Sequence, residues 1–128
     1  MIYVDTSVIL ARLFAEDRYP PDSFWDEPLV SSRLTEYEVL NRIHSRKAEK
    51  THGEAARDLL GRMSLAELSP HILARALEPF PVAVRTLDGL HLATFQFLSA
   101  IDPKLTLATY DQKLAEAAHK MKFQTYRF

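Results

Sequence analysis

Runs of apolar residues along the chain follow two different periods, which separate predicted strands from predicted helices. Short apolar runs at residues 2–4, 29–31 and 105–109 predict buried strands. Longer segments repeat apolar residues every three or four positions, which is typical of helices packed on a core. These helices are predicted at residues 7–15, 35–47, 51–63, 87–99 and 111–121, with one more beginning at Ser69.

Turn residues separate these elements. Ser69 and Pro70 form a usual helix start, with serine as N-cap and proline in the first helical position. Residues 65–68 are predicted as a strand or as an extension of the preceding helix, and residues 124–126 as a last strand. Because strands and helices alternate without a linker or repeat, we expect a single α/β domain over residues 1–128. It should be a three-layer sandwich with a mostly parallel central sheet flanked by helices.

Composition excludes several classes of site. The chain has no cysteine, which rules out disulfides, thiolate metal sites and cysteine nucleophiles. No apolar run reaches the ~18 residues that a membrane span needs, and the first ten residues lack the pattern of a signal peptide. We therefore expect a cytoplasmic protein without a membrane partner.

Four acidic residues stand at positions where α/β proteins place their ligands, the carboxyl ends of parallel strands. Asp5 directly follows the first predicted strand, and Asp111 follows the third by one residue. Glu38 lies in the first turn of the helix after the second strand, and Asp88 lies where a later helix opens. The topology would bring the four carboxylates together.

Each acid also has a purely structural explanation. Asp5 suits a turn, and Asp88 and Asp111 suit helix N-caps or first turns. Thr35 and Glu38 have the spacing of a capping box, in which the glutamate satisfies a backbone N–H.

Glu36 competes with Glu38 for the same role. On a helical wheel Glu36 falls within the apolar stripe of the helix, where a carboxylate is costly, whereas Glu38 lies far from it. Glu36 is therefore expected at the frayed start of the helix or at the rim of the pocket, and the preference for Glu38 rests chiefly on the motif match to the family described below.

Electrostatics decides what such a cluster needs. Two carboxylates ~5 Å apart repel by about 3 kcal/mol at an effective dielectric constant of ~20. Four together require either protonation or a bound cation. Oxygen ligands without histidine or cysteine suit Mg²⁺ or Mn²⁺ rather than zinc. Such an ion can activate water and stabilise a leaving oxygen, which is the chemistry of phosphodiester hydrolysis.

The motifs around these acids resemble those of PIN-domain nucleases, and among them the VapC-type toxins of bacterial toxin–antitoxin pairs. The matching stretches run through the whole chain: Asp5-Thr6-Ser7, Ser31-Ser32-Arg33-Leu34-Thr35, Glu38-Val39-Leu40, Thr86-Leu87-Asp88-Gly89-Leu90-His91-Leu92-Ala93-Thr94 and Thr109-Tyr110-Asp111-Gln112-Lys113-Leu114. The resemblance implies an Mg²⁺-dependent endoribonuclease, with Mn²⁺ as a substitute. It also implies a homodimer and a VapB-like antitoxin that inhibits by occupying the groove.

The resemblance also assigns roles to individual residues. It implies that Asp5, Glu38, Asp88 and Asp111 bind the metal and activate water. It further implies that Ser7 and Thr109 support them by hydrogen bonding.

Residues that would bind RNA are less evident from the sequence. Arg12, Arg42 and Arg46 are candidates for phosphate contacts. His91 lies one helical turn after Asp88, so it either contacts substrate or is a hydrogen-bonded structural residue. A net charge of −1 argues against nucleic-acid binding, although basic residues cluster around His44. The alternative function is a non-catalytic PIN-like module that binds RNA or protein, and the intact set of four acids speaks against it.

Overall fold

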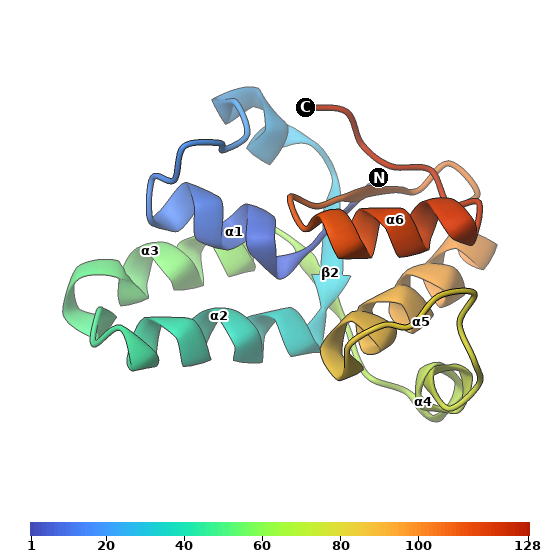
Figure 1. Cartoon of the computed structure of the whole chain (residues 1–128). Coiled ribbons are helices and arrows are strands. Elements are labelled where there is room, and N and C mark those ends of the chain that lie inside the picture. The colour runs from blue at the N-terminus through green and yellow to red at the C-terminus, as the bar shows by residue number, and fades with distance from the viewer.

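A four-stranded parallel sheet lies between two layers of helices in the computed structural model, which describes residues 1–128 (Figure 1). The strand order is β3-β2-β1-β4, with β1 at Ile2–Val4, β2 at Leu29–Ser32, β3 at Ser64–Ala66 and β4 at Thr106–Ala108. All three pairings are parallel, so every strand has its carboxyl end at the same edge of the sheet. The predicted three-layer α/β sandwich is confirmed.

Strand β1 occupies a central position, and its side chains supply both cores. Ile2 and Val4 belong to one hydrophobic cluster and Tyr3 belongs to the other, as expected for a strand whose side chains alternate between two buried faces. In register, Tyr3 pairs with Val30 on β2 and with Leu107 on β4. This arrangement explains why the first run of the chain is apolar without interruption.

Helices α1 (Thr6–Leu13), α2 (Arg33–Ser45) and α3 (Glu49–Gly61) form one layer. Their apolar faces meet the sheet in a cluster that includes Val8, Ile9, Val39, Ile43 and Leu60.

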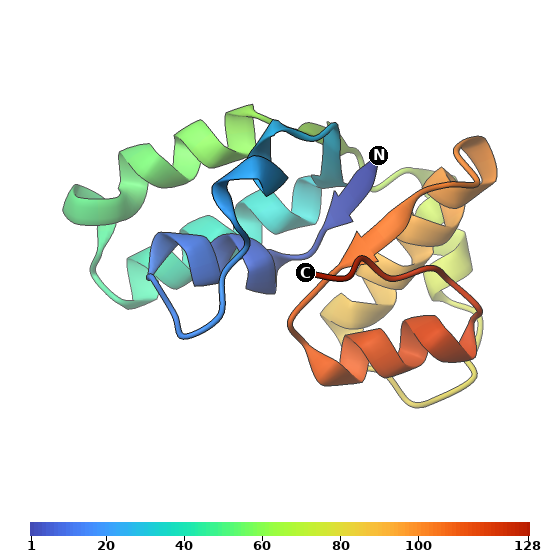
Figure 2. The same ribbon diagram turned by 90° about the horizontal axis from the view of Figure 1, so that it is seen from above.

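Helices α4 (Pro70–Ala76), α5 (Thr86–Ile101) and α6 (Gln112–Lys120) form the other layer, on the opposite side of β1 and β4 in the view of Figure 2. Leu92, Phe95, Leu114 and Ala117 fill that side. No helix combines the length and the apolar character that crossing a membrane requires.

The structure differs from the sequence predictions at several boundaries. Helix α2 begins at Arg33, two residues earlier than predicted, because the Ser32 side chain accepts a hydrogen bond from Leu34 N (3.0 Å) and caps it. Residues 64–66 are a strand and not a helical extension. The predicted strand at 124–126 is reduced to one parallel bridge between Leu107 and Thr125. A short 3₁₀ helix, η1 (Asp22–Asp26), was not predicted.

Candidate acidic active site

The four acids singled out from the sequence line one cleft at the carboxyl edge of the sheet. The cleft has a volume of about 650 Å³. Asp5 is the N-cap of α1, Glu38 projects from α2, Asp88 lies in the first turn of α5, and Asp111 is the N-cap of α6. Because the strands are parallel, the turns that follow β1 and β4 meet there, and residues of α2 and of the start of α5 complete the lining. Since α2 begins at Arg33, Glu38 lies in its second turn and not in the first turn as predicted.

Asp5 is the most deeply buried of the four, with 5% of its surface exposed. Its Oδ2 accepts hydrogen bonds from Ser7 Oγ (2.7 Å), Ser7 N (3.3 Å) and Thr109 Oγ1 (2.8 Å). These bonds fix the carboxylate and leave Oδ1 without a hydrogen bond of its own. Ser7 and Thr109, the two supporting residues implied by the resemblance, therefore both contact Asp5.

Thr109 also links the two turns that carry acids. Its Oγ1 accepts a hydrogen bond from Asp111 N (3.0 Å), while Ser7 Oγ accepts one from Tyr110 N (3.0 Å). The β1–α1 turn and the β4–α6 turn are thereby held together by side-chain hydroxyls, although about 100 residues separate them in the chain. This contact sets the position of Asp111 relative to Asp5.

Glu38, and not Glu36, faces the cleft. Glu38 Oε1 accepts a hydrogen bond from Thr6 Oγ1 (2.9 Å) and contacts His91 Nε2 (2.6 Å). Glu36 lies outside the cleft lining, 40% exposed, with Oε1 3.4 Å from a guanidinium nitrogen of Arg33.

The capping-box explanation for Glu38 is wrong. Ser32 caps the helix instead, and the buried Thr35 hydroxyl lies 2.7 Å from Ser31 Oγ.

His91 lies beneath the acids and is only 2% exposed, which leaves no room for the direct substrate contact considered from the sequence. Its Nδ1 lies 2.8 Å from Tyr3 Oη, and its Nε2 lies 2.6 Å from Glu38 Oε1 and 3.8 Å from Asp5 Oδ1. Burial disfavours the charged ring, but the hydrogen bond to Glu38 and the nearby carboxylates outweigh it and raise the pKa of His91 above its ordinary value. The ring thus orients Glu38 from inside the core.

Arg85, which the sequence reasoning missed, holds the remaining two acids. Its Nε donates to Asp88 Oδ2 (3.1 Å) and its Nη2 to Asp111 Oδ2 (2.6 Å). Burial raises the pKa of Asp88, the contact with Arg85 offsets this only in part, and the charges of Asp111 and Asp5 raise it further. The spacing of three residues between Arg85 and Asp88 was a signal in the sequence, but nothing local pointed to Asp111.

The structural explanation by capping holds for some acids and not for others. Asp111 Oδ1 accepts from Lys113 N (2.9 Å) and Leu114 N (3.2 Å), so this residue caps α6 with one oxygen and meets Arg85 with the other. Asp88 does not cap α5, whose N-cap position is Arg85, but it lies in the first turn of α5, which is the other structural position expected for it. Capping therefore accounts for part of Asp111 but leaves the burial of Asp88 unexplained.

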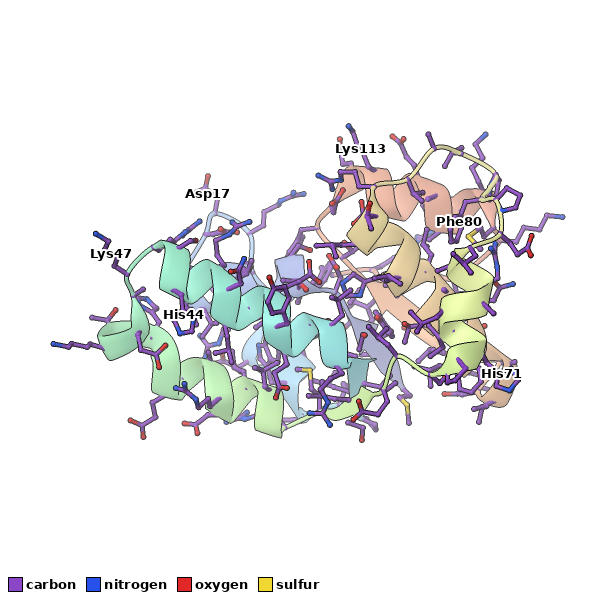
Figure 3. The ribbon with its side chains drawn as sticks, turned by 90° about the horizontal axis from the view of Figure 1, so that it is seen from below. Asp17, His44, Lys47, His71, Phe80 and Lys113 are labelled. Atoms are coloured by element: carbon purple, nitrogen blue, oxygen red, sulfur yellow. The ribbon has the colours of Figure 1, made fainter.

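Only some of the candidate substrate-binding residues reach the cleft. Arg42 lines it, together with Arg18, which had not been considered. Arg12 lies outside the lining, 3.8 Å from Asp22, and Arg46 stacks over the Phe14 ring at 4.3 Å. Two other histidines, His44 and His71, lie toward opposite ends of the molecule in Figure 3 and do not add to the site.

The residues present fit a hard divalent cation by the chemistry of their donors. All four acids offer carboxylate oxygen, and neither cysteine nor an exposed histidine accompanies them. One oxygen each of Asp5, Glu38 and Asp88 makes no hydrogen bond in the protein. The acids do not form a closed cage, since no three acidic or histidine side chains converge closely enough to hold an ion. Arg85 keeps two of them on its guanidinium group.

Comparisons with known proteins show which family the chain matches. The model of the family described as "PIN domain" matches residues 2–120. Among curated proteins of Mycobacterium tuberculosis, the chain is 32% identical to "Ribonuclease VapC35", over 94% of this chain and 92% of that protein. It is 29% identical to "Ribonuclease VapC47", over 98% and 95%. A solved structure, "Toxin-antitoxin complex from Klebsiella pneumoniae", has a similar fold with a TM-score of 0.60, 20% identity and 88% coverage of each chain.

Proposed function

The chain belongs to the PIN-domain family and is related to its VapC-type ribonucleases, and from this premise we propose that it is a Mg²⁺-dependent endoribonuclease that hydrolyses RNA phosphodiester bonds. One observation carries the proposal. Four carboxylates from four separate elements line a single cleft, and two of them, Asp5 and Glu38, are held from the protein side so that one oxygen stays free.

The electrostatic cost of this arrangement favours a catalytic site over a structural one. Asp5 and Asp88 are both largely withdrawn from water. Three hydrogen bonds compensate Asp5, but burial raises the pKa of Asp88 even with Arg85 beside it, so the ionised form of Asp88 is costly in the folded protein. A purely structural role would be served better by apolar or amide side chains. The cost is consistent with a site that is completed by binding a cation.

The chain's own residues would divide the work in the following way. Asp5, Glu38, Asp88 and Asp111 would hold the ion, while Ser7, Thr109, Thr6 and His91 would fix the orientation of Asp5 and Glu38. Bound there, Mg²⁺ or Mn²⁺ supplies Lewis-acid chemistry that polarises phosphate and favours the ionisation of water. Arg18 and Arg42, on the cleft wall, would contact the phosphates that flank the cleaved bond.

The proposal extends to the biological role. The names of the ribonuclease relatives and the fold shared with a chain of a toxin–antitoxin complex support a toxin that pairs with a VapB-like antitoxin in the cytoplasm. We propose a homodimer as the functional unit. The exposed apolar side chains of Leu77 on the α4 side and Ile101 at the end of α5, 87% and 72% exposed, offer surface for contacts between proteins.

An RNA cleavage assay with purified protein tests the enzyme. The wild-type chain should cleave RNA in Mg²⁺, and cleavage should stop when EDTA removes the metal. The cleavage rate of Asp5→Asn should be at least ~100-fold lower than that of the wild type. Asp58→Asn, a change of the same chemistry at an exposed position on α3, should cleave like the wild type. Equal cleavage by Asp5→Asn and the wild type would indicate a contaminating nuclease. Specific RNA binding without any cleavage would favour the non-catalytic module.

The toxin role needs a separate test in cells. Expression of the wild-type chain alone should slow growth, and Asp5→Asn should not. Co-expression of the product of an adjacent small reading frame should restore growth and copurify with the chain. Normal growth under strong expression of active protein would overturn the toxin role while leaving the nuclease intact.

A further inference from the structure

Arg85 places a positive charge directly beside the acids that we propose bind a metal cation. It is the residue before the first turn of α5, and its guanidinium reaches across the cleft mouth to α6, bridging Asp88 Oδ2 at 3.1 Å and Asp111 Oδ2 at 2.6 Å. Its side chain is nevertheless 64% exposed. The group is anchored by the two carboxylates while most of its surface remains in water.

The charged residues that line the cleft explain why the positively charged guanidinium of Arg85 lies there. Its lining holds five acids, Asp5, Glu16, Glu38, Asp88 and Asp111, against three arginines, Arg18, Arg42 and Arg85. Among the three arginines, Arg85 alone makes a hydrogen bond or ion pair with any of the four site acids. It therefore screens the repulsion between Asp88 and Asp111 in the protein without metal.

We propose that Arg85 is an internal counter-ion, which a divalent cation displaces from Asp88 and Asp111 and which then binds a phosphate of the nucleic-acid backbone. This inference rests on the proposed function, because it assumes that the acids take up a metal. It gives Arg85 two alternating partners, the acids when the cation is absent and the substrate when the cation is bound.

Displacement follows from charge and geometry. The guanidinium uses one oxygen of each acid, and a divalent cation held by the same carboxylates would repel it at close range. Exposed ion pairs are weak, so two such contacts do not prevent the exchange. Once released, the planar guanidinium at the rim of the cleft has the geometry for two parallel hydrogen bonds to a phosphate.

Arg33 provides a matched comparison within the same chain. It also bridges two carboxylates, with Nε and Nη2 3.1 and 3.0 Å from Glu67 Oε1 and Nη1 3.4 Å from Glu36 Oε1, and it is 46% exposed. Arg33 lies outside the acidic cleft. Any effect of metal that is specific to the site should therefore appear at Arg85 and not at Arg33.

Nuclear magnetic resonance of the arginine Nε–H groups tests displacement directly. During a Mg²⁺ titration of the wild-type protein without RNA, the Arg85 Nε–H signal should shift and exchange faster with water, while the Arg33 signal stays in place. The backbone amide signals of Asp5 and Asp111 show when the site is saturated with Mg²⁺. An Arg85 signal that stays unmoved while these amides saturate would overturn the inference.

Calorimetry and RNA binding provide the second readout. Mn²⁺ should bind Arg85→Gln with an affinity about threefold to tenfold higher than the wild type, because two weak ion pairs no longer compete. Arg33→Gln should match the wild type. With metal present, Arg85→Gln should bind a hydrolysis-resistant phosphorothioate oligonucleotide more weakly than Arg33→Gln does, and without metal the two should bind alike.

The outcomes separate the inference from the proposed function. Mn²⁺ affinities that are equal for the wild type and Arg85→Gln, or oligonucleotide affinities that do not differ between Arg85→Gln and Arg33→Gln, would overturn the role of Arg85 while the metal site stands. Failure of every variant and of the wild type to bind metal would instead overturn the proposed function.

Discussion

Nε2 of His91 lies 2.6 Å from Oε1 of Glu38, and the other nitrogen of the same ring lies 2.8 Å from the hydroxyl of Tyr3. Tyr3 is fully buried in the centre of β1, so the contact fixes Glu38 to the middle of the sheet. A side chain on α2 is thereby positioned by residues from β1 and α5. The orientation of Glu38 does not depend on α2 alone.

The first prediction concerns pH and the protein without metal. Because the pKa of His91 is raised in the folded state, its stabilising effect is complete below the unfolded pKa of ~6.5 and is lost as pH rises through the folded value. In EDTA, His91→Asn should lower the free energy of unfolding by about 2–4 kcal/mol at pH 6. The difference from the wild type should shrink toward pH 9, as measured by urea unfolding.

His71→Asn is the control for this experiment. His71 is exposed on α4 and lies outside the cleft lining, so the variant should follow the wild type at every pH. A stability difference between wild type and His91→Asn that grows with pH would contradict the role given to the charged ring.

The parts of the molecule that could be predicted from the sequence are those that depend on local pattern and topology. The uninterrupted apolar run of β1 indicated a doubly buried strand, and parallel strands bring residues such as Asp5 and Asp111 to one edge. The early start of α2 depended on the Ser32 hydroxyl, whose capping role was hidden by the strand just before it.

The contacts that orient the acids could not be predicted in this way. His91 joins Tyr3 and Glu38 across 88 and 53 residues of chain, and Arg85 reaches Asp111 across 26. Such pairs are set by how the helices pack on the sheet, and no periodicity in a single segment encodes them. Arg85 was therefore missed, and His91 was considered for a substrate contact that its burial excludes.

A second prediction separates the two glutamates of α2. Glu38→Gln keeps the size of the side chain but removes the charge of a carboxylate that we propose binds the metal, so RNA cleavage in Mg²⁺ should fall by roughly 100-fold. Glu36→Gln should leave cleavage unchanged, because Glu36 pairs with Arg33 outside the cleft. Initial cleavage rates at saturating Mg²⁺ compare the two. Similar losses in both variants would mean that Glu38 has no special role.

A third prediction tests the hydroxyl that joins the two acidic turns. Thr109→Val preserves shape but removes the donor to Asp5 and the acceptor for Asp111 N. It should cost about 1–3 kcal/mol in unfolding free energy and weaken Mg²⁺ binding about 10-fold or more. Thr109→Ser keeps the hydroxyl and should retain both properties. The idea fails if valine and serine at this position give the same Mg²⁺ affinity by calorimetry.

The last prediction is that an acid of the site destabilises the protein until a cation binds. The raised pKa of Asp88 means that folding disfavours its ionised form, so the penalty appears as pH rises above ~3.9 and is complete above the folded value. In EDTA at pH 7, Asp88→Asn should therefore melt a few degrees higher than the wild type. Mg²⁺ should raise the melting temperature of the wild type and raise that of Asp88→Asn much less, because ligands that bind only the folded state stabilise it.

Asp58→Asn, exposed on α3, should respond to Mg²⁺ as the wild type does. A lower melting temperature of Asp88→Asn in EDTA would show that the ion pair with Arg85 outweighs the burial of the carboxylate.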